Sequence, residues 1–284
     1  MAPLPPLMDR RFTLDGLELA AQQWGEPSAP QILALHGWLD NSESFAPLAR
    51  ALTPLGWQLL APDWPGHGHS GHRGAASDYH FLDYLYELHQ LIEQLGDRPV
   101  ILLGHSMGGI LATLYAGVYP ERVSALISIE ALGPLTAGAE ETAERLRQGF
   151  ASRRPVVPKP VNLAAALRAR SRINELDQAI LEPMVMRNLR ATEAGWYWRS
   201  DPRVKRLSPW RMSPEQGEAI LNAITAPTLV MLAQKGFSTL KERWQHRPAG
   251  LAGATLVNAP GGHHGHMSAP EAYASAIHRF LRPD

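Results

Sequence analysis

Apolar residues gather in two kinds of stretch along this 284-residue chain. Some stretches are short and continuous, such as Val100–Leu103, and in others apolar residues recur every three or four positions. Continuous apolar runs predict strands buried on both faces, whereas the longer period predicts helices. Because the two kinds alternate, the pattern predicts an α/β fold with a mostly parallel central sheet flanked by helices.

The predicted elements follow this alternation through most of the chain. Residues 11–24 alternate in polarity around a turn at Asp15-Gly16, which predicts an antiparallel hairpin. A helix is predicted at residues 81–95, where the apolar residues have helical spacing and end at Gly96. The other predicted strands are 31–35, 58–61, 100–103, 123–129, 227–233 and 254–258, and the other predicted helices are 42–52, 107–119 and 270–281.

The alternation breaks between Gly133 and about Ala223. This stretch is arginine-rich, has helical character and contains the aromatic run Trp196-Tyr197-Trp198. We expect a helical cap at residues 134–223, inserted between two core strands and covering the carboxyl edge of the sheet, where ligands bind in such folds. Residues 1–133 and 224–284 then form the core. The arginines can be a solvated face and the tryptophans the interior of the cap, or both can face a substrate.

Composition narrows the class of protein. Lys+Arg and Asp+Glu both number 27, so nothing favours a nucleic-acid partner or a charged membrane surface. The absence of cysteine excludes disulfides, thiol nucleophiles and cysteine metal sites. The N-terminal residues lack the pattern of a secretory signal, and no apolar run is long enough for an integral membrane segment. We therefore expect a soluble, cytoplasmic protein.

One turn carries the pattern of a catalytic nucleophile. Residues 104–108, Gly-His-Ser-Met-Gly, fit the motif G-x-S-x-G between a predicted strand and a predicted helix, which is the context that this motif requires. Small residues two positions on either side of Ser106 let strand and helix approach closely. The serine hydroxyl is then held clear of the sheet beside a helix N-terminus. Ser106 is the predicted nucleophile.

A serine hydroxyl needs a general base, and one histidine-rich loop stands out among the 12 histidines of the chain. Residues 260–267, Pro-Gly-Gly-His-His-Gly-His-Met, follow the last predicted strand, so the order of serine, acid and histidine suits the motif. His263, His264 and His266 could instead form a metal site. No carboxylate or spaced histidine is evident nearby, so we expect no metal and no cofactor.

The third catalytic group must be a carboxylate that orients the histidine. Glu130 directly follows the predicted strand at 123–129. The segment after the strand at 227–233 has no acid before Glu242. Glu130 is therefore the predicted acid, although a carboxylate there could also face solvent or pair with a cap arginine.

An acyl-transfer site also needs two N–H donors for the oxyanion. The N–H of Met107 directly follows the nucleophile, and Trp38, after His36-Gly37, is the second candidate. Asp63 is expected to act as scaffold, pinning the glycine-rich turn at 65–70 by accepting N–H bonds.

Four motifs together resemble the α/β-hydrolases. They are H-G-W at 36–38, D-x-P-G-H-G-x-S at 63–70, G-H-S-M-G-G at 104–109 and G-H-x-x-H-M-x-x-P at 262–270. Within that superfamily the chain resembles capped serine hydrolases, most closely the serine hydrolase-like, carboxylesterase-type group. The resemblance implies that His263 is the base, because the catalytic histidine of the family directly follows the glycine, and that His266 is structural.

One departure concerns the acid. Many members carry an aspartate in a G-x-x-D-type segment where this chain has Gln234-Lys-Gly-Phe237. The place of Glu130 is similar to that of the acid in haloalkane dehalogenases. Those enzymes and the epoxide hydrolases use an aspartate nucleophile, which Ser106 argues against.

These observations predict a serine esterase that acts on small to medium carboxylic esters, without a cofactor. Ser106 attacks, His263 moves the proton, Glu130 orients His263, and the N–H groups of Trp38 and Met107 stabilise the oxyanion. Lactone opening, amide cleavage, carbon–carbon bond hydrolysis and acyl transfer use the same triad and stay open. So does a non-catalytic small-molecule receptor on the same fold.

Overall fold

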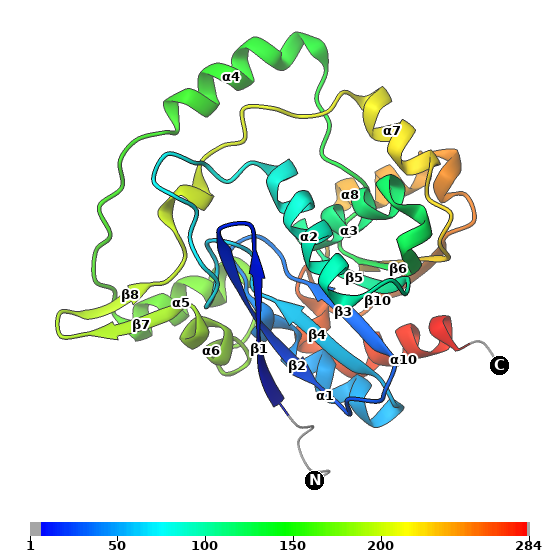
Figure 1. Cartoon of the computed structure of the whole chain (residues 1–284), viewed down its shortest axis with the longest axis horizontal. Coiled ribbons are helices and arrows are strands. Elements are labelled where there is room, and N and C mark those ends of the chain that lie inside the picture. Colours follow the sequence, from blue (N-terminus) through cyan, green and yellow to red (C-terminus); the bar gives the residue numbers. More distant parts are fainter. Residues whose placement is uncertain (1–6, 283–284) are drawn as a thin grey trace.

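The computed structural model describes residues 7–282 and contains an eight-stranded sheet at its centre (Figure 1). Its order is β1-β2-β4-β3-β5-β6-β9-β10. β1 and β2 pair antiparallel, as do β2 and β4, and the remaining neighbours are parallel. The strands are β1 (Leu7–Leu14), β2 (Leu17–Trp24), β3 (Gln31–Leu35), β4 (Gln58–Pro62), β5 (Val100–His105), β6 (Val123–Ile129), β9 (Thr228–Ala233) and β10 (Thr255–Ala259). The predicted mostly parallel sheet is confirmed.

Helices cover both faces of this sheet. Leu88, Leu111 and Leu221 bring α2, α3 and α7 to one core cluster, and Leu48 and Ile277 bring α1 and α10 to the other. Apolar residues on the buried strands fill both clusters, which is why their sequences lack alternation. The helices of the core are α1 (Ala46–Leu52), α2 (Phe81–Leu95), α3 (Met107–Val118), α8 (Ser238–Gln245), α9 (Gly265–Ser268) and α10 (Pro270–Leu281), and α7 (Pro214–Asn222), the last helix of residues 134–223, packs with them.

The predicted elements lie within a few residues of the observed ones. The N-terminal hairpin is longer than predicted, because β1 already begins at Leu7. The predicted helix at 42–52 starts with a 3₁₀ turn at Ser42–Phe45, capped by the side chain of Asn41, before α1 continues it. The helix α2 ends at Gly96, whose φ of 102° a residue with a side chain rarely adopts.

Residues 134–223, which we call the insertion, leave the sheet after β6 and return at β9. The insertion holds α4 (Thr142–Ala151), α5 (Leu163–Asn174), α6 (Gln178–Arg187) and a hairpin of β7 (Leu189–Thr192) and β8 (Gly195–Trp198). α5, α6 and the hairpin share a small apolar cluster of their own, whereas α4 lies apart from the other helices (Figure 1). α7 packs against the core, where a Cβ at Gly117 would overlap Ile220.

The hairpin is a departure from the expected helical segment. Trp196 and Trp198 lie on β8, whose first residue, Gly195, has a φ of 115°. A glycine at positive φ followed by aromatic residues favours a hairpin over a helix. Within residues 7–282, no helix combines the length and the apolar character needed to cross a bilayer.

Candidate active site

The predicted nucleophile lies on a strained turn between β5 and α3. Ser106 has φ 51° and ψ −117°, and its N–H donates to the carbonyl of Ile129 on β6 over 3.0 Å. A Cβ at Gly104 would overlap Gly108, and a Cβ at Gly108 would overlap the carbonyl of Leu35. Glycine at these two positions lets β5, α3 and β3 converge, so the backbone holds Ser106 at the point where they meet.

Glu130 follows β6 directly and is almost fully buried, with 3% of its surface exposed. Its Oε2 lies 3.3 Å from Nδ1 of His263, and its Oε1 accepts the N–H of Ala233 over 2.6 Å. Burial alone would raise the pKa of Glu130, but the hydrogen bonds from His263 and Ala233 bring it below its ordinary value. The buried carboxylate is therefore ionised at neutral pH and can hold the imidazole.

The predicted base is half-buried on the loop after β10. Because Nδ1 of His263 donates to a carboxylate, the neutral ring has its lone pair on Nε2, the nitrogen that would take a proton from a serine. Burial lowers the pKa of His263, and the hydrogen bond to Glu130 offsets part of that effect. The ring packs against Phe237, with centroids 4.6 Å apart.

The turn after β9 passes so close to Glu130 that it has no room for a side chain at Gly236. A Cβ at Gly236 would overlap the carboxylate of Glu130. The next acid, Glu242, is exposed on α8. The carboxylate that meets His263 in this structure is therefore that of Glu130.

The loop at residues 36–41 carries the second predicted oxyanion donor. His36 is buried, and it accepts the N–H of Trp64 over 2.9 Å at Nε2 and donates to the carbonyl of Gly37 over 2.7 Å at Nδ1. Trp38 is half-exposed, and its indole N–H donates to the carbonyl of Val204 in the insertion over 2.9 Å. Met107 directly follows Ser106 at the start of α3, whereas Trp38 lies on the loop after β3. The role of their N–H groups as oxyanion donors stays a prediction.

The predicted scaffold role of Asp63 is confirmed. Its fully buried carboxylate accepts the N–H groups of Ser42 and His69, each over 2.8 Å. The guanidinium of Arg187 on α6 forms an ion pair with the same carboxylate, with Nη2 2.8 Å from Oδ2 of Asp63. Asp63 therefore pins two loops of the core and one helix of the insertion at the same point.

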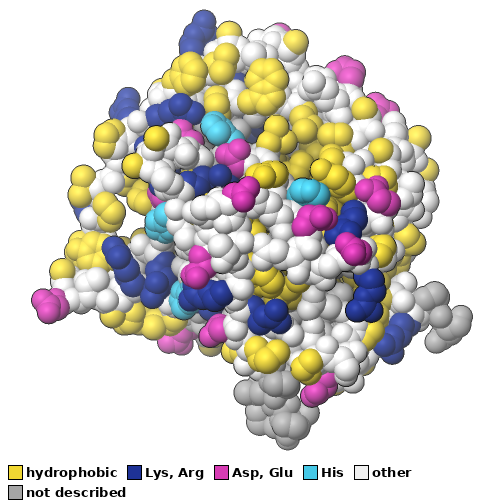
Figure 2. Space-filling model, viewed as in Figure 1, with side chains coloured by type: hydrophobic (Ala, Val, Ile, Leu, Met, Phe, Trp, Pro, Cys, Tyr) yellow, Lys and Arg dark blue, Asp and Glu magenta, His cyan; other side chains and the backbone are white. Residues whose placement is uncertain are grey.

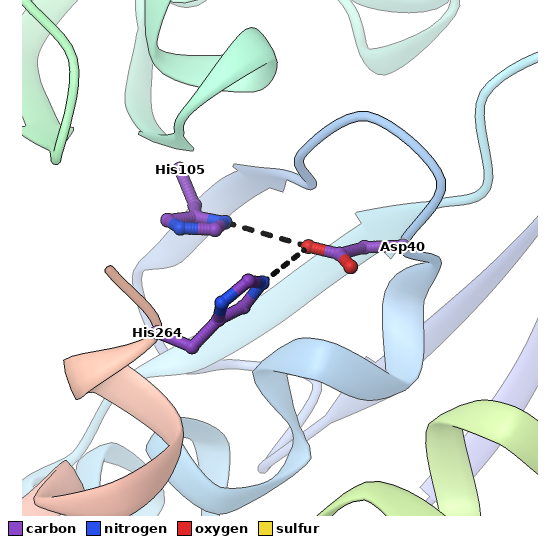
Figure 3. A group of neighbouring side chains, drawn as sticks. All are labelled: Asp40, His105 and His264. Carbon is purple, nitrogen blue, oxygen red and sulfur yellow. Dashed lines mark hydrogen bonds and ion pairs between the residues drawn. The ribbon is translucent and has the colours of Figure 1, made fainter. Parts of the chain in front are cut away.

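Asp40, His105 and His264 form a buried cluster that the motifs did not single out as a group (Figure 3). Oδ2 of Asp40 lies 3.1 Å from Nε2 of His264 and 3.6 Å from Nδ1 of His105, while Oδ1 pairs with Arg170 of α5 over 2.7 Å. Nε2 of His105 donates to the carbonyl of His263 over 2.9 Å. The cluster thus ties the loop of the base to the elbow and to the insertion.

The same cluster bears on the metal alternative. Among residues 7–282, the side chains close enough together to share a cation are Asp40, His105 and His264. One carboxylate and two imidazoles are a donor set that transition metals accept. Both oxygens of Asp40 already have partners, Arg170 and His264, so the structure presents the cluster as a hydrogen-bonded support. His266, the third histidine of the loop, is fully buried against the ring of His105.

Comparisons with known proteins agree with this architecture. Residues 30–270 match a family model described as the alpha/beta hydrolase fold. A serine hydrolase-like protein of Danio rerio is 28% identical over 280 residues, which cover 94% of this chain and 86% of that protein.

Two solved structures extend the comparison to three dimensions. A hypothetical protein from Pseudomonas aeruginosa is 33% identical, with a TM-score of 0.86 and coverage of 96% of this chain and 97% of that one. A thioesterase domain from the curacin biosynthetic pathway is 26% identical, with a TM-score of 0.86 and coverage of 96% and 99%.

Proposed function

The chain belongs to the α/β-hydrolase fold family, and from that premise we propose that it cleaves small to medium carboxylic esters through an acyl-enzyme formed on Ser106. One observation carries the proposal. The carboxylate of Glu130, directly after β6, lies 3.3 Å from Nδ1 of His263, which belongs to the predicted histidine loop. A serine on a strained elbow, a neutral histidine and a buried carboxylate are the parts that acyl transfer uses.

The proposed reaction has two similar halves. Nε2 of His263 removes the proton of Ser106 as the serine oxygen attacks the ester carbonyl. The N–H groups of Trp38 and Met107 stabilise the oxyanion, and His263 then protonates the departing alcohol. In the second half, His263 removes a proton from water as the water attacks the acyl-enzyme, and it then returns the proton to Ser106 as the carboxylic acid leaves. Glu130 stays ionised throughout, because it orients the imidazole and stabilises the imidazolium that forms.

We propose that the insertion acts as a cap over this site. Arg170 and Arg187 bind its helices to Asp40 and Asp63, and Trp38 donates to Val204, so the insertion is anchored to loops of the core at three points. A cap in this place limits the size of the substrate and excludes water.

Thioesters are a second candidate substrate class, supported by a separate comparison. The thioesterase domain of the curacin pathway aligns with almost the whole chain at a TM-score of 0.86. A thioester passes through the same tetrahedral intermediate, with a thiol in place of the alcohol as the leaving group. Lactones and amides use the same chemistry, without an observation that favours them here.

The test combines turnover with covalent labelling. Purified protein is assayed on p-nitrophenyl esters of increasing acyl length, and a fluorophosphonate probe is mapped by peptide mass spectrometry. We expect turnover and a label on Ser106, both lost in Ser106→Ala, whereas the exposed Ser124→Ala on β6 retains them. A label on another serine would exclude this nucleophile. A folded protein with neither label nor turnover would favour the receptor alternative.

A further inference from the structure

A cavity of about 790 Å³ lies between the insertion and the core, away from the elbow. Its wall comes from four parts of the chain: the turn at residues 68–72, the connection at residues 156–161, Arg190 on β7 and the segment at residues 198–205. Val156, Val157 and Trp198 make part of the wall apolar. The cavity is large enough for a sizeable organic group.

Four cations line this cavity without a carboxylate partner. Lys159, Arg190, Arg199 and Lys205 take part in no ion pair among residues 7–282. The one acid in the wall, Asp201, is buried and already engaged by Arg203 over 2.7 Å and by Tyr79 over 2.9 Å. The cavity therefore carries a local excess of positive charge.

This excess is a local feature. The whole chain has equal numbers of acidic and basic residues. Other arginines of the insertion are paired, including Arg145 with Glu141 and Arg153 with Asp78. Figure 2 shows Lys and Arg side chains gathered on the part of the surface that Figure 1 assigns to the β7–β8 hairpin. Lys159, Arg190 and Lys205 are exposed and Arg199 is partly buried, so the four cations give the cavity a positive potential that attracts anions.

A smaller cavity adjoins the large one on the side of the loop after β3. It has a volume of about 60 Å³ and shares Trp198, Ser200 and Lys205 with the large cavity. Its other lining includes Leu39 and Arg170. Leu39 is the neighbour of Trp38 in the chain, and Arg170 pairs with Asp40. A ligand in the large cavity can thus extend past Lys205 toward the loop that carries Trp38.

We propose that this cavity binds an anionic group of the substrate, so that the preferred substrates are esters or thioesters bearing a phosphate or carboxylate remote from the scissile carbonyl. The proposal rests on the proposed function and narrows it to a substrate class. Arginine pairs with both kinds of anion through two parallel N–H bonds, and lysine adds a point charge. The apolar wall accommodates the carbon chain between the anion and the carbonyl.

A binding experiment tests the site without relying on catalysis. Ser106→Ala is titrated calorimetrically with pyrophosphate for the phosphate arm and with glutarate for the carboxylate arm, at low and high salt. We expect at least one anion to bind, with an affinity that falls as salt screens the charges. Absence of binding by both anions at low salt would overturn the proposal.

Kinetics on matched substrates test the substrate class. Butyryl-CoA and p-nitrophenyl hydrogen glutarate are each compared with the neutral p-nitrophenyl butyrate. In Arg190→Gln and in Lys205→Gln, the ratio of kcat/KM for the anionic to the neutral substrate should fall about tenfold, the loss of one charged hydrogen bond. Lys205→Arg should restore the ratio, and the exposed Arg147→Gln on α4, which pairs with Glu144 away from the cavity, should leave it unchanged.

The outcomes separate this proposal from the proposed function. Anion binding by Ser106→Ala together with no hydrolysis of any ester by the wild-type protein would support the anion site and overturn the esterase. Hydrolysis of neutral esters with no anion binding would overturn the anion site alone. An equal loss in Arg147→Gln would show that general surface charge, and not this cavity, is responsible, and would overturn it too.

Discussion

Glu130 and His263 are separated by 133 positions in the sequence, yet Oε2 of the first lies 3.3 Å from Nδ1 of the second. The sheet explains this contact. β6, which ends at Ile129, pairs with β5 on one side and with β9 on the other, so the carboxylate emerges next to the elbow. The loop that carries His263 follows β10 and reaches Glu130 across the end of β9.

Replacing the proposed acid should disable the base. Glu130→Gln keeps the size of the side chain but offers an amide to Nδ1 of His263, which favours the wrong tautomer. By analogy with the change of aspartate to asparagine in the triad of serine proteases, kcat should fall about 10³- to 10⁴-fold while KM changes little. Steady-state kinetics measures this. Glu242→Gln is the control, and a loss of kcat in the control alone would place the acid on α8.

The pH profile should reflect a histidine with a lowered pKa. Only the neutral ring of His263 can accept the proton of Ser106, so kcat/KM should rise with pH and then level off. Burial places the pKa of His263 below its usual value of about 6.5, so the plateau should be reached by neutral pH. In Glu130→Gln the raising influence of the carboxylate is gone, and the midpoint should move to lower pH. A flat profile between about pH 5 and 8 would contradict histidine base catalysis.

Asp40 should act as a positioning residue behind the triad. Asp40→Asn weakens the contacts to His264 and Arg170, which hold the loop of the base. A displacement of about 1 Å in that loop should lower kcat about ten- to a hundredfold. Because Asp40 also raises the pKa of His263, the midpoint of the pH profile should fall in the variant. A loss of thermal stability with an unchanged midpoint and unchanged kcat per folded molecule would indicate a purely structural role.

Asp63 should matter for stability more than for chemistry. Asp63→Asn leaves the nearly buried guanidinium of Arg187 without its countercharge, which should cost about 3 to 5 kcal/mol in the free energy of unfolding. Glu18→Gln, which breaks the exposed pair with Arg11, should cost less than about 1 kcal/mol. Denaturant titration measures both. Equal losses in the free energy of unfolding in the two variants would contradict a larger contribution from the buried ion pair.

The dependence on pH gives a second readout for Asp63. Burial alone would raise the pKa of Asp63, but the charge of Arg187 brings it below the ordinary value. A lowered pKa in the folded state means that its contribution is present above the unfolded pKa of about 3.9 and is lost as the pH falls through the folded value. Wild type should therefore lose its advantage over Asp63→Asn in acid, and a constant difference would contradict this assignment.

The two tryptophans of β8 should have different roles. Both pack against the apolar cluster of the insertion, but Trp198 also lines both cavities. Trp198→Ala should shift the preferred acyl length, whereas Trp196→Ala should mainly lower stability, by about 1 to 3 kcal/mol for a partly buried large side chain. An ester series and thermal melts separate the two. If Trp198→Ala lowers kcat/KM equally for every ester and also lowers Tm strongly, Trp198 serves the packing of the insertion and not substrate selection.

The elbow and the mostly parallel sheet could be predicted because both leave local signals. Gly104 and Gly108 are required because neighbouring backbone lies too close to leave room for a Cβ at either position. The buried strands are recognisable because their residues are continuously apolar. The hairpin of the insertion left a weaker signal, since its strands are four residues each. The secondary structure of so short a segment depends on the residues it packs against, which the local sequence does not reveal.

The support behind the triad could not be predicted for a different reason. Asp40 and Arg170 are 130 positions apart, and Asp40 and His264 are 224 apart. Neither pair belongs to a common motif, so only the folded chain brings them together. His105 offered the one available hint, because it lies inside the elbow motif, but its contact with the carbonyl of His263 depends on the place of a distant loop.

Glu130 and a side chain at position 236 would compete for one volume, and this limits which residues the turn after β9 can carry. A Cβ at Gly236 would already overlap the Glu130 carboxylate, so any larger residue there would displace that carboxylate from His263. A chain that takes its acid from the end of β6 is therefore held to glycine at this position.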